Sequence, residues 1–183
     1  MHRRTRAFVF VASVLSVSGS LVLAQDRQGR GGVPPGAEVA PQPAAEAIPM
    51  YGEPLALDRA QRVIVAAERE AKRLNISPAL AVVDSTGHLV MFEKLDNSDY
   101  GNGDIALALA KSAVEFRRPT KEFGDTVATN PTIAFLPGVV PFQGGWPILV
   151  NGRLVGALGV VGTRGGVQNA GNMVADAGVN AAK

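Results

Sequence analysis

The stretch Trp146-Pro-Ile-Leu-Val-Asn-Gly-Arg-Leu-Val-Gly-Ala-Leu-Gly-Val-Val161 decides the fold of this chain. Its two apolar runs flank the dipeptide Asn151-Gly152. Asn-Gly between apolar runs is the strongest short-range signal for a β-hairpin, because both residues tolerate a positive φ. Gly156 and Gly159 lie inside the second run, and glycines within a strand indicate that another part of the protein approaches its backbone closely. The stretch therefore predicts a hairpin against which another element packs.

A second hairpin is predicted upstream, from strand-like runs at residues 79–84 and 88–94. The segment Ser85-Thr86-Gly87 joins them, and its glycine can take the positive φ of a turn. A helix is predicted before this hairpin, from Asp58 to Asn75, because apolar residues recur on one face at helical spacing. Hairpins, in contrast to βαβ crossovers, place neighbouring strands antiparallel.

Three further helices are predicted at residues 104–116, 120–127 and 167–182. The first of them is rich in alanine on all sides, which indicates tight packing against another surface. The region 130–145 shows little periodicity. The order helix, hairpin, two helices, hairpin, helix predicts an α+β fold with an antiparallel sheet flanked by helices.

The first 54 residues carry targeting and linker signals. Residues 1–24 have the layout of a secretory signal peptide, with a basic start, an apolar run and Ala24 at the cleavage point. The alternative is an uncleaved membrane anchor, since the run approaches the length of a bilayer span. Residues 25–54 are rich in proline, glycine and alanine, and predict a disordered linker. We expect one folded domain at residues 55–183, in the periplasm or secreted.

Charge and composition exclude several classes of function. The chain has 18 basic and 16 acidic residues, and removal of Arg3, Arg4 and Arg6 with the signal leaves 15 against 16, a net charge of −1. We therefore expect no nucleic-acid partner and, after cleavage, no membrane association. The chain has no cysteine, which excludes thiolate metal sites and c-type haem attachment. His88 is the only histidine outside the signal, so a zinc site or a serine-histidine triad is not expected.

The residue types in and after the second predicted helix suit a carboxylated ligand. Lys111 and Arg118 can anchor an anion, although a lysine among alanines also commonly extends into solvent. Backbone amides at the start of the last helix can hold an anionic group as well, or the glycines there serve turn geometry alone.

Several motifs, in this order, resemble the GlcG/HbpS-like haem-binding (haem-degrading domain) family. They are Val83-Asp84-x-x-Gly87-His88, Ala110-Lys111, Arg118-Pro119-Thr120, Gly144-Gly145-x-Pro147-Ile148 and Asn151-Gly152-x-x-Val155-Gly156. The resemblance implies a profilin-like α+β fold, a homo-oligomer and haem as cofactor. One departure is Gln168-Asn169, where the family often has Gln-Asp.

The resemblance also implies a ligand pocket near the second helix and a subunit interface. The expected ligand-binding residues are His88, Lys111, Phe116, Arg118, Thr120, Gly144, Gly145 and Asn169. His88 or Thr120 is the expected haem iron ligand, and further ligand types are Tyr51, Tyr100, Met50, Met91 and Met173. Phe123, Phe135, Phe142 and Trp146 are candidate pocket walls, or core residues.

Two functions follow, from different classes. The first is an exported haem-binding protein that sequesters or transports haem or senses redox state. The second is an enzyme that acts on a small organic carboxylate or aromatic catabolite, with Lys111 and Arg118 on the anion and Asp84 or Lys111 as general acid/base. A periplasmic interaction module without a ligand is a third alternative.

Overall fold

The computed structural model describes residues 47–162 and 169–183. Its helices and strands are α1 (Leu57–Arg73), β1 (Ala79–Asp84), β2 (Leu89–Lys94), α2 (Asn102–Phe116), α3 (Lys121–Val127), the 3-10 helix η1 (Pro131–Phe135), β3 (Gly145–Val150), β4 (Arg153–Val161) and α4 (Ala170–Asn180). The expected signal peptide lies outside the described residues, as does the expected linker up to residue 46. No helix within 47–162 and 169–183 has both the length and the apolar composition needed to cross a bilayer.

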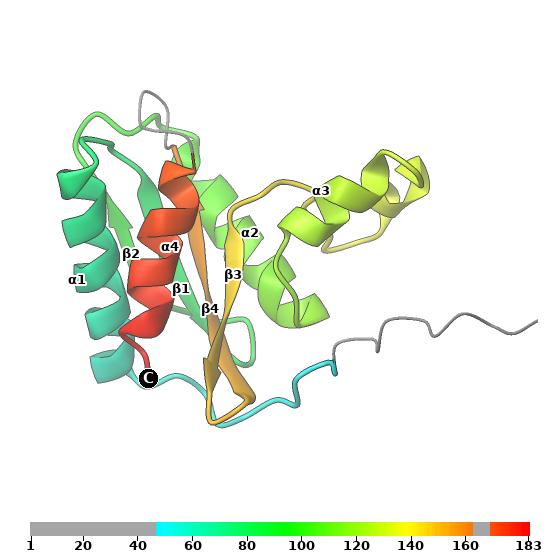
Figure 1. Ribbon diagram of the computed structural model, residues 1–183, viewed down its shortest axis with the longest axis horizontal. Coiled ribbons are helices and arrows are strands. Elements are labelled where there is room, and N and C mark those ends of the chain that lie inside the picture. The colour runs from blue at the N-terminus through cyan, green and yellow to red at the C-terminus, as the bar shows by residue number, and fades with distance from the viewer. Residues whose placement is uncertain (1–46, 163–168) are drawn as a thin grey trace, which may run out of the picture. The chain divides into compact units, whose positions relative to one another are not determined.

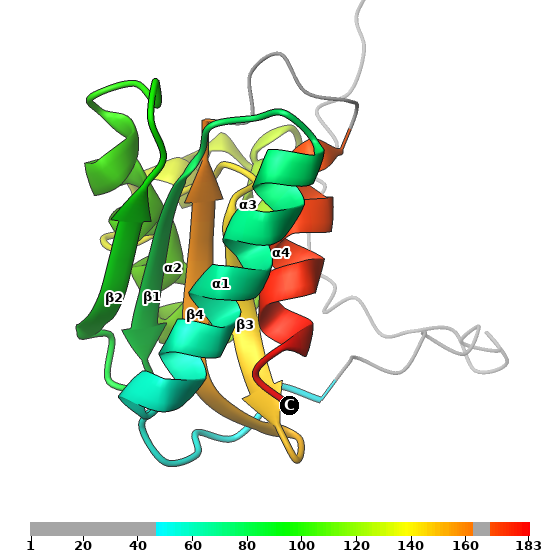
Figure 2. The same ribbon diagram turned by 90° about the vertical axis from the view of Figure 1, so that its left-hand side faces the viewer.

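Four antiparallel strands form one sheet in the order β2-β1-β4-β3. Helices α1 and α4 cover one face and α2 covers the other (Figures 1 and 2). The α+β fold with an antiparallel sheet between helices is thereby confirmed. Both predicted hairpins are present, and the second turns at Asn151 and Gly152 with φ values of 52° and 74°.

The main core lies between the sheet and the α1–α4 layer. The apolar face predicted for the first helix is fully buried, at Ala60, Val63, Ile64, Ala67 and Ala71. Helix α4 completes the layer with Val174 and Ala175. Burial of this stripe, more than intrinsic helix propensity, holds α1 in place.

Helix α2 packs on the opposite face through small residues, as the alanine-rich sequence predicts. Ala106, Ala110 and Ala113 are fully buried against the sheet. A Cβ atom added to Gly159 would lie 1.9 Å from the carbonyl oxygen of Ala106. The glycine predicted to permit a close approach therefore does so, and the approaching element is α2.

The ends of some elements differ from the prediction. Helix α4 begins at Ala170, because Asn169 has a left-handed φ of 65° that a helix does not continue through. Residues 163–168, where this helix was expected to start, lie outside the described part. The poorly periodic region contains η1, which lies with α3 in an arm beside the α2 side of the sheet (Figure 1).

The contact between α2 and β4 gives a stability prediction. We expect Gly159→Ala to lower the free energy of unfolding by about 2–3 kcal/mol or more, because the new methyl group overlaps a helix carbonyl that cannot move independently. Urea unfolding of the purified domain measures this. Gly101→Ala is the matched control, since nothing lies within 4 Å of its added Cβ and its φ is −74°. Equal stability of the two variants would contradict the close approach.

Candidate ligand-binding cleft

A cavity of about 910 Å³ lies against the edge strand β3. Three parts of the chain line it: residues 47–50, the connection from α2 to α3, and the β3–β4 hairpin. Its apolar lining is formed by Ile48, Pro49, Met50, Phe116, Pro119, Trp146, Pro147 and Leu149. We call this cavity the edge cleft. Its volume and apolar walls are typical of sites that take a drug-sized or cofactor-sized ligand.

The cleft forms here because of how α2 and β3 end. Helix α2 stops at Arg117, whose left-handed φ of 55° turns the chain away and leaves Phe116 and Arg118 at the corner. Within the part of the chain that the structure describes, strand β3 pairs with no strand on its outer side, so it tolerates Pro147, which lacks a backbone N–H donor. The side chains along this edge are therefore available to a ligand.

Three guanidinium groups line the edge cleft, from Arg117, Arg118 and Arg153. Arg117 donates to the Pro49 carbonyl at 3.4 Å, and Arg153 donates to the Tyr51 carbonyl at 3.4 Å. Arg118 lies 3.9 Å from Glu122, the only carboxylate among the lining residues. Three cations against one carboxylate favour an anionic group on the ligand.

The expected residues Phe116 and Arg118 both line the edge cleft, whereas Thr120 is not among its lining residues. Thr120 is fully buried, and its hydroxyl donates to the Phe142 carbonyl at 2.5 Å. The same oxygen accepts from the Gly145 amide at 2.9 Å. Thr120 thus joins the start of α3 to β3, and in this conformation its oxygen faces backbone partners and not the edge cleft.

Gly144 and Gly145 lie at the same contact, where the start of α3 meets β3. A Cβ on Gly145 would lie 2.3 Å from the Leu109 carbonyl oxygen, and one on Gly144 would lie 2.6 Å from the Leu109 Cδ1 atom. Both glycines are buried, so they allow β3 to approach α2. They line a smaller cavity of about 280 Å³ on the other side of Trp146, with Lys121, Gln143, Asn172 and Asp176.

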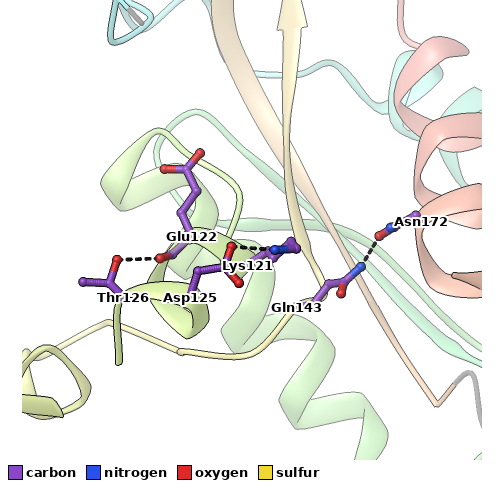
Figure 3. Close-up of polar contacts among 6 residues, drawn as sticks. All are labelled: Lys121, Glu122, Asp125, Thr126, Gln143 and Asn172. Carbon is purple, nitrogen blue, oxygen red and sulfur yellow. Dashed lines mark hydrogen bonds and ion pairs between the residues drawn. The ribbon is translucent and has the colours of Figure 1, made fainter. Parts of the chain in front are cut away.

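Lys121 and Gln143, which line this smaller cavity, make polar contacts that are drawn in Figure 3. The side-chain amide of Gln143 donates to Asn172 and so connects the loop before β3 to α4. Lys121 pairs with Asp125 on its own helix. The expected ligand residue Asn169 is exposed and lines a separate cavity of about 240 Å³.

His88 and Asp84 lie in the β1–β2 turn and line none of these cavities. Asp84 accepts hydrogen bonds from the Thr86 amide at 2.8 Å and the His88 amide at 3.1 Å, and the Thr86 hydroxyl lies 2.7 Å from the His88 ring. Burial by itself raises the pKa of the Asp84 carboxyl, but hydrogen bonds from Thr86 and His88 outweigh it and leave the pKa below its ordinary value. Hydrogen bonds within the turn favour the ionised form of the Asp84 carboxyl, so this group is better suited to stabilising the turn than to acting as a general acid.

Lys111 is exposed on α2 and lines none of these cavities. The structure therefore does not bring Lys111 or Asp84 together with Arg118 in the described part of the chain. Two arginines that line the edge cleft, Arg117 and Arg153, were not among the expected residues, and neither were residues 47–49. Met50 was expected, but only as one of several haem ligand types. Arg153 carried one usable signal, since it directly follows the predicted Asn-Gly turn.

The architecture defines the class: an α+β domain with one four-stranded antiparallel sheet between two helical layers. The haem-degrading HbpS-like family matches residues 55–180 of this chain. Because that match covers more than half of the chain, the protein belongs to the HbpS-like family.

Relatives of known sequence agree with this assignment. The Escherichia coli K12 protein GlcG is 34% identical over 108 residues, which cover 58% of this chain and 80% of GlcG. A 15.0 kDa protein from the dhaT-dhaS intergenic region of Citrobacter freundii is 30% identical over 113 residues, covering 59% of this chain and 80% of that protein.

Solved structures share the fold. Klebsiella pneumoniae protein ORFY has a TM-score of 0.65 at 22% identity, over 78% of this chain and 97% of its own. PduOC, solved as a complex with heme, has a TM-score of 0.61 at 22% identity, over 70% and 94%. A double mutant of Streptomyces reticuli HbpS has a TM-score of 0.60 at 26% identity, over 79% and 94%.

The Thr120 junction gives the prediction for this region. We expect Thr120→Val to lower the free energy of unfolding by about 1–3 kcal/mol, because it keeps the side-chain shape but removes the partner of the buried Gly145 amide and of the partly buried Phe142 carbonyl. The matched control is Thr126→Val, whose exposed hydroxyl donates to Glu122 within α3. Denaturant unfolding compares the two, and equal stability would show that the Thr120 hydroxyl is not structural.

Proposed function

We propose that this protein binds haem in the edge cleft. The observation that carries the proposal is the combination, in one cavity of about 910 Å³, of a mostly apolar lining with three arginines. Haem has the complementary form: a flat apolar macrocycle with two propionate groups at one edge. Trp146, Pro147 and Leu149 would face the ring, and the arginines would hold the propionates.

One residue that lines the cleft has a side chain able to coordinate the iron of a porphyrin. Met50 lines the edge cleft with 67% of its surface exposed, and its thioether is a known haem iron ligand type. Among the residues of 47–162 and 169–183 that line this cavity, there is no histidine, cysteine or tyrosine. We therefore assign Met50, in place of His88 or Thr120, as the protein ligand. Bound haem would supply a redox-active iron centre, while the chain supplies the walls, the cations and this sulfur.

The family supports the proposal in two ways. The HbpS-like family is described as haem-degrading, and PduOC, which shares the fold, was solved as a heme complex. Sequestration, transport and redox sensing are the roles that such binding serves, and turnover of haem is a further one. The expected homo-oligomer, with the cleft near a subunit interface, stays a prediction.

The arginines give a direct test of the site. We expect Arg118→Ala combined with Arg153→Ala to weaken haem affinity about tenfold or more, because two charge-assisted contacts to propionates at an open cleft are lost. Haem titration, followed by the Soret band of the purified domain, measures the affinity. Arg69→Ala combined with Arg73→Ala removes the same charge from α1 and should leave affinity unchanged. Equal weakening by both pairs would mean that net charge, and not this cleft, governs binding.

The iron ligand has its own spectroscopic test. We expect Met50→Ala to remove the sulfur-to-iron charge-transfer band of the ferric complex and shift its visible spectrum, while His88→Ala leaves both unchanged. Met173→Ala, at another partly exposed methionine, is the matched control. A spectrum that changes with His88→Ala alone would return the ligand role to the β1–β2 turn.

We also propose that the domain functions after export. The basic start, the apolar run and Ala24 support this. When the full chain is expressed in a Gram-negative host, we expect a periplasmic product whose N-terminus is Gln25. Leu21→Arg, which interrupts the apolar run, should leave the chain in the cytoplasm. A membrane-bound product that begins at Met1 would identify an anchor instead.

A further inference from the structure

Residues 47–52, which we call the strap, lie against the domain beyond the end of β1. Pairing between β1 and β4 ends at Asp84 and Gly156, which leaves the start of β4 open on that side. The strap occupies this position: the Leu154 amide donates to the Met50 carbonyl at 2.9 Å, and the Gly52 amide donates to the Leu154 carbonyl at 2.7 Å. In Figure 1 this cyan segment passes the β3–β4 hairpin before α1 begins.

Tyr51 ties the strap to α2 as well. Its hydroxyl lies 3.0 Å from the Val114 carbonyl and 3.2 Å from the Glu115 carbonyl, and donates to them. These carbonyls belong to the last turn of the helix, where backbone acceptors lack the usual i+4 amide partner. The Val114 carbonyl also accepts from the Arg117 amide at 3.2 Å. The Arg117 guanidinium lies over the Tyr51 ring, 5.3 Å from its centre, and also donates to the Pro49 carbonyl.

The strap therefore connects two elements that bound the edge cleft and supplies one of its walls. Ile48, Pro49 and Met50 line the cavity, whereas Tyr51 does not. The family match begins at residue 55, so this wall lies outside the part of the chain that the family model covers. Most of the hydrogen bonds that hold the strap against the domain are made to Leu154, Val114 and Glu115.

We propose that Tyr51 is a positioning residue for ligand binding: it anchors the strap, and the anchored strap completes the edge cleft. This inference rests on the proposed binding of haem. Loss of the hydroxyl changes none of the side chains that line the cleft, but it removes an anchor of the strap. The strap is then free to move, and the ligand must order it on binding. The cost of that ordering appears as weaker affinity.

The test compares Tyr51→Phe with Tyr100→Phe in the chain without its signal, residues 25–183. Tyr100, the only other tyrosine, is 98% exposed and is not among the residues that line the edge cleft or the two smaller cavities. Its variant therefore loses the same hydroxyl group at a position that does not contact the strap. Two readouts are needed: amide hydrogen exchange at Gly52 and Leu154, and haem affinity from Soret titration. We expect Tyr51→Phe to speed exchange at both amides and to weaken haem affinity about fivefold, the equivalent of one net hydrogen bond. Tyr100→Phe should change neither.

The outcomes separate the two proposals. Unchanged exchange in Tyr51→Phe would overturn the anchoring role. Faster exchange with unchanged haem affinity would overturn the claim that the strap completes the cleft, and haem binding would stand. Failure of the wild-type chain to bind haem would overturn the proposed function, while exchange at Gly52 would still decide whether Tyr51 anchors the strap.

Discussion

The close contact between helix α2 and strand β4 is the constraint on which the rest of this structure depends. Gly159 leaves room for the Ala106 carbonyl, where a Cβ would lie 1.9 Å from the oxygen. One turn further along the helix, Gly145 leaves the same room for the Leu109 carbonyl. With two glycines of neighbouring strands under one helix, α2 has a fixed distance from the sheet. The end of α2, and with it the corner at Arg117, is thereby placed beside β3.

The edge cleft is a consequence of that placement. The chain turns away at Arg117, and Thr120 then bonds back to Gly145, so the α2–α3 connection is held along the edge strand. Phe116 and Arg118 occur in this connection and face the same cavity as Trp146 and Arg153. The apolar walls and the cations thus come together from segments far apart in sequence. Backbone contacts hold these segments in position, more than contacts among the lining side chains do.

The elements of the fold could be predicted because local signals mark them. Helical spacing places α1, and the Asn-Gly turn places the β3–β4 hairpin within a residue or two. The alanines of α2 predicted tight packing and the glycines of β4 predicted a close approach to the strand, because small side chains allow two backbones to come near each other.

The site was predictable only in part, because it depends on contacts between distant residues. Phe116 and Arg118 line the edge cleft, whereas His88 and Lys111, which were expected from their chemistry, do not. The proline-rich composition up to residue 54 predicted a linker, yet the strap is seated by backbone bonds to Leu154, about a hundred residues away. Composition carries no information about such an acceptor. The thioether of Met50 could be named as a possible ligand from its chemistry, but its place in a wall of the edge cleft could not have been predicted.

The position of the cleft on an edge strand suggests why a ligand would also stabilise this protein. An exposed strand edge is a site for unwanted pairing with other chains, and Pro147 removes one of the backbone donors of β3. Leu149 on the same strand is 37% exposed, so apolar surface remains uncovered along this edge. A flat ligand over Trp146, Pro147 and Leu149 would bury that surface without entering the sheet. By linkage, a ligand at a hundred times its dissociation constant adds about 2.7 kcal/mol to the free energy of unfolding. The same contacts that would bind the ligand would therefore also cover this exposed edge of the sheet.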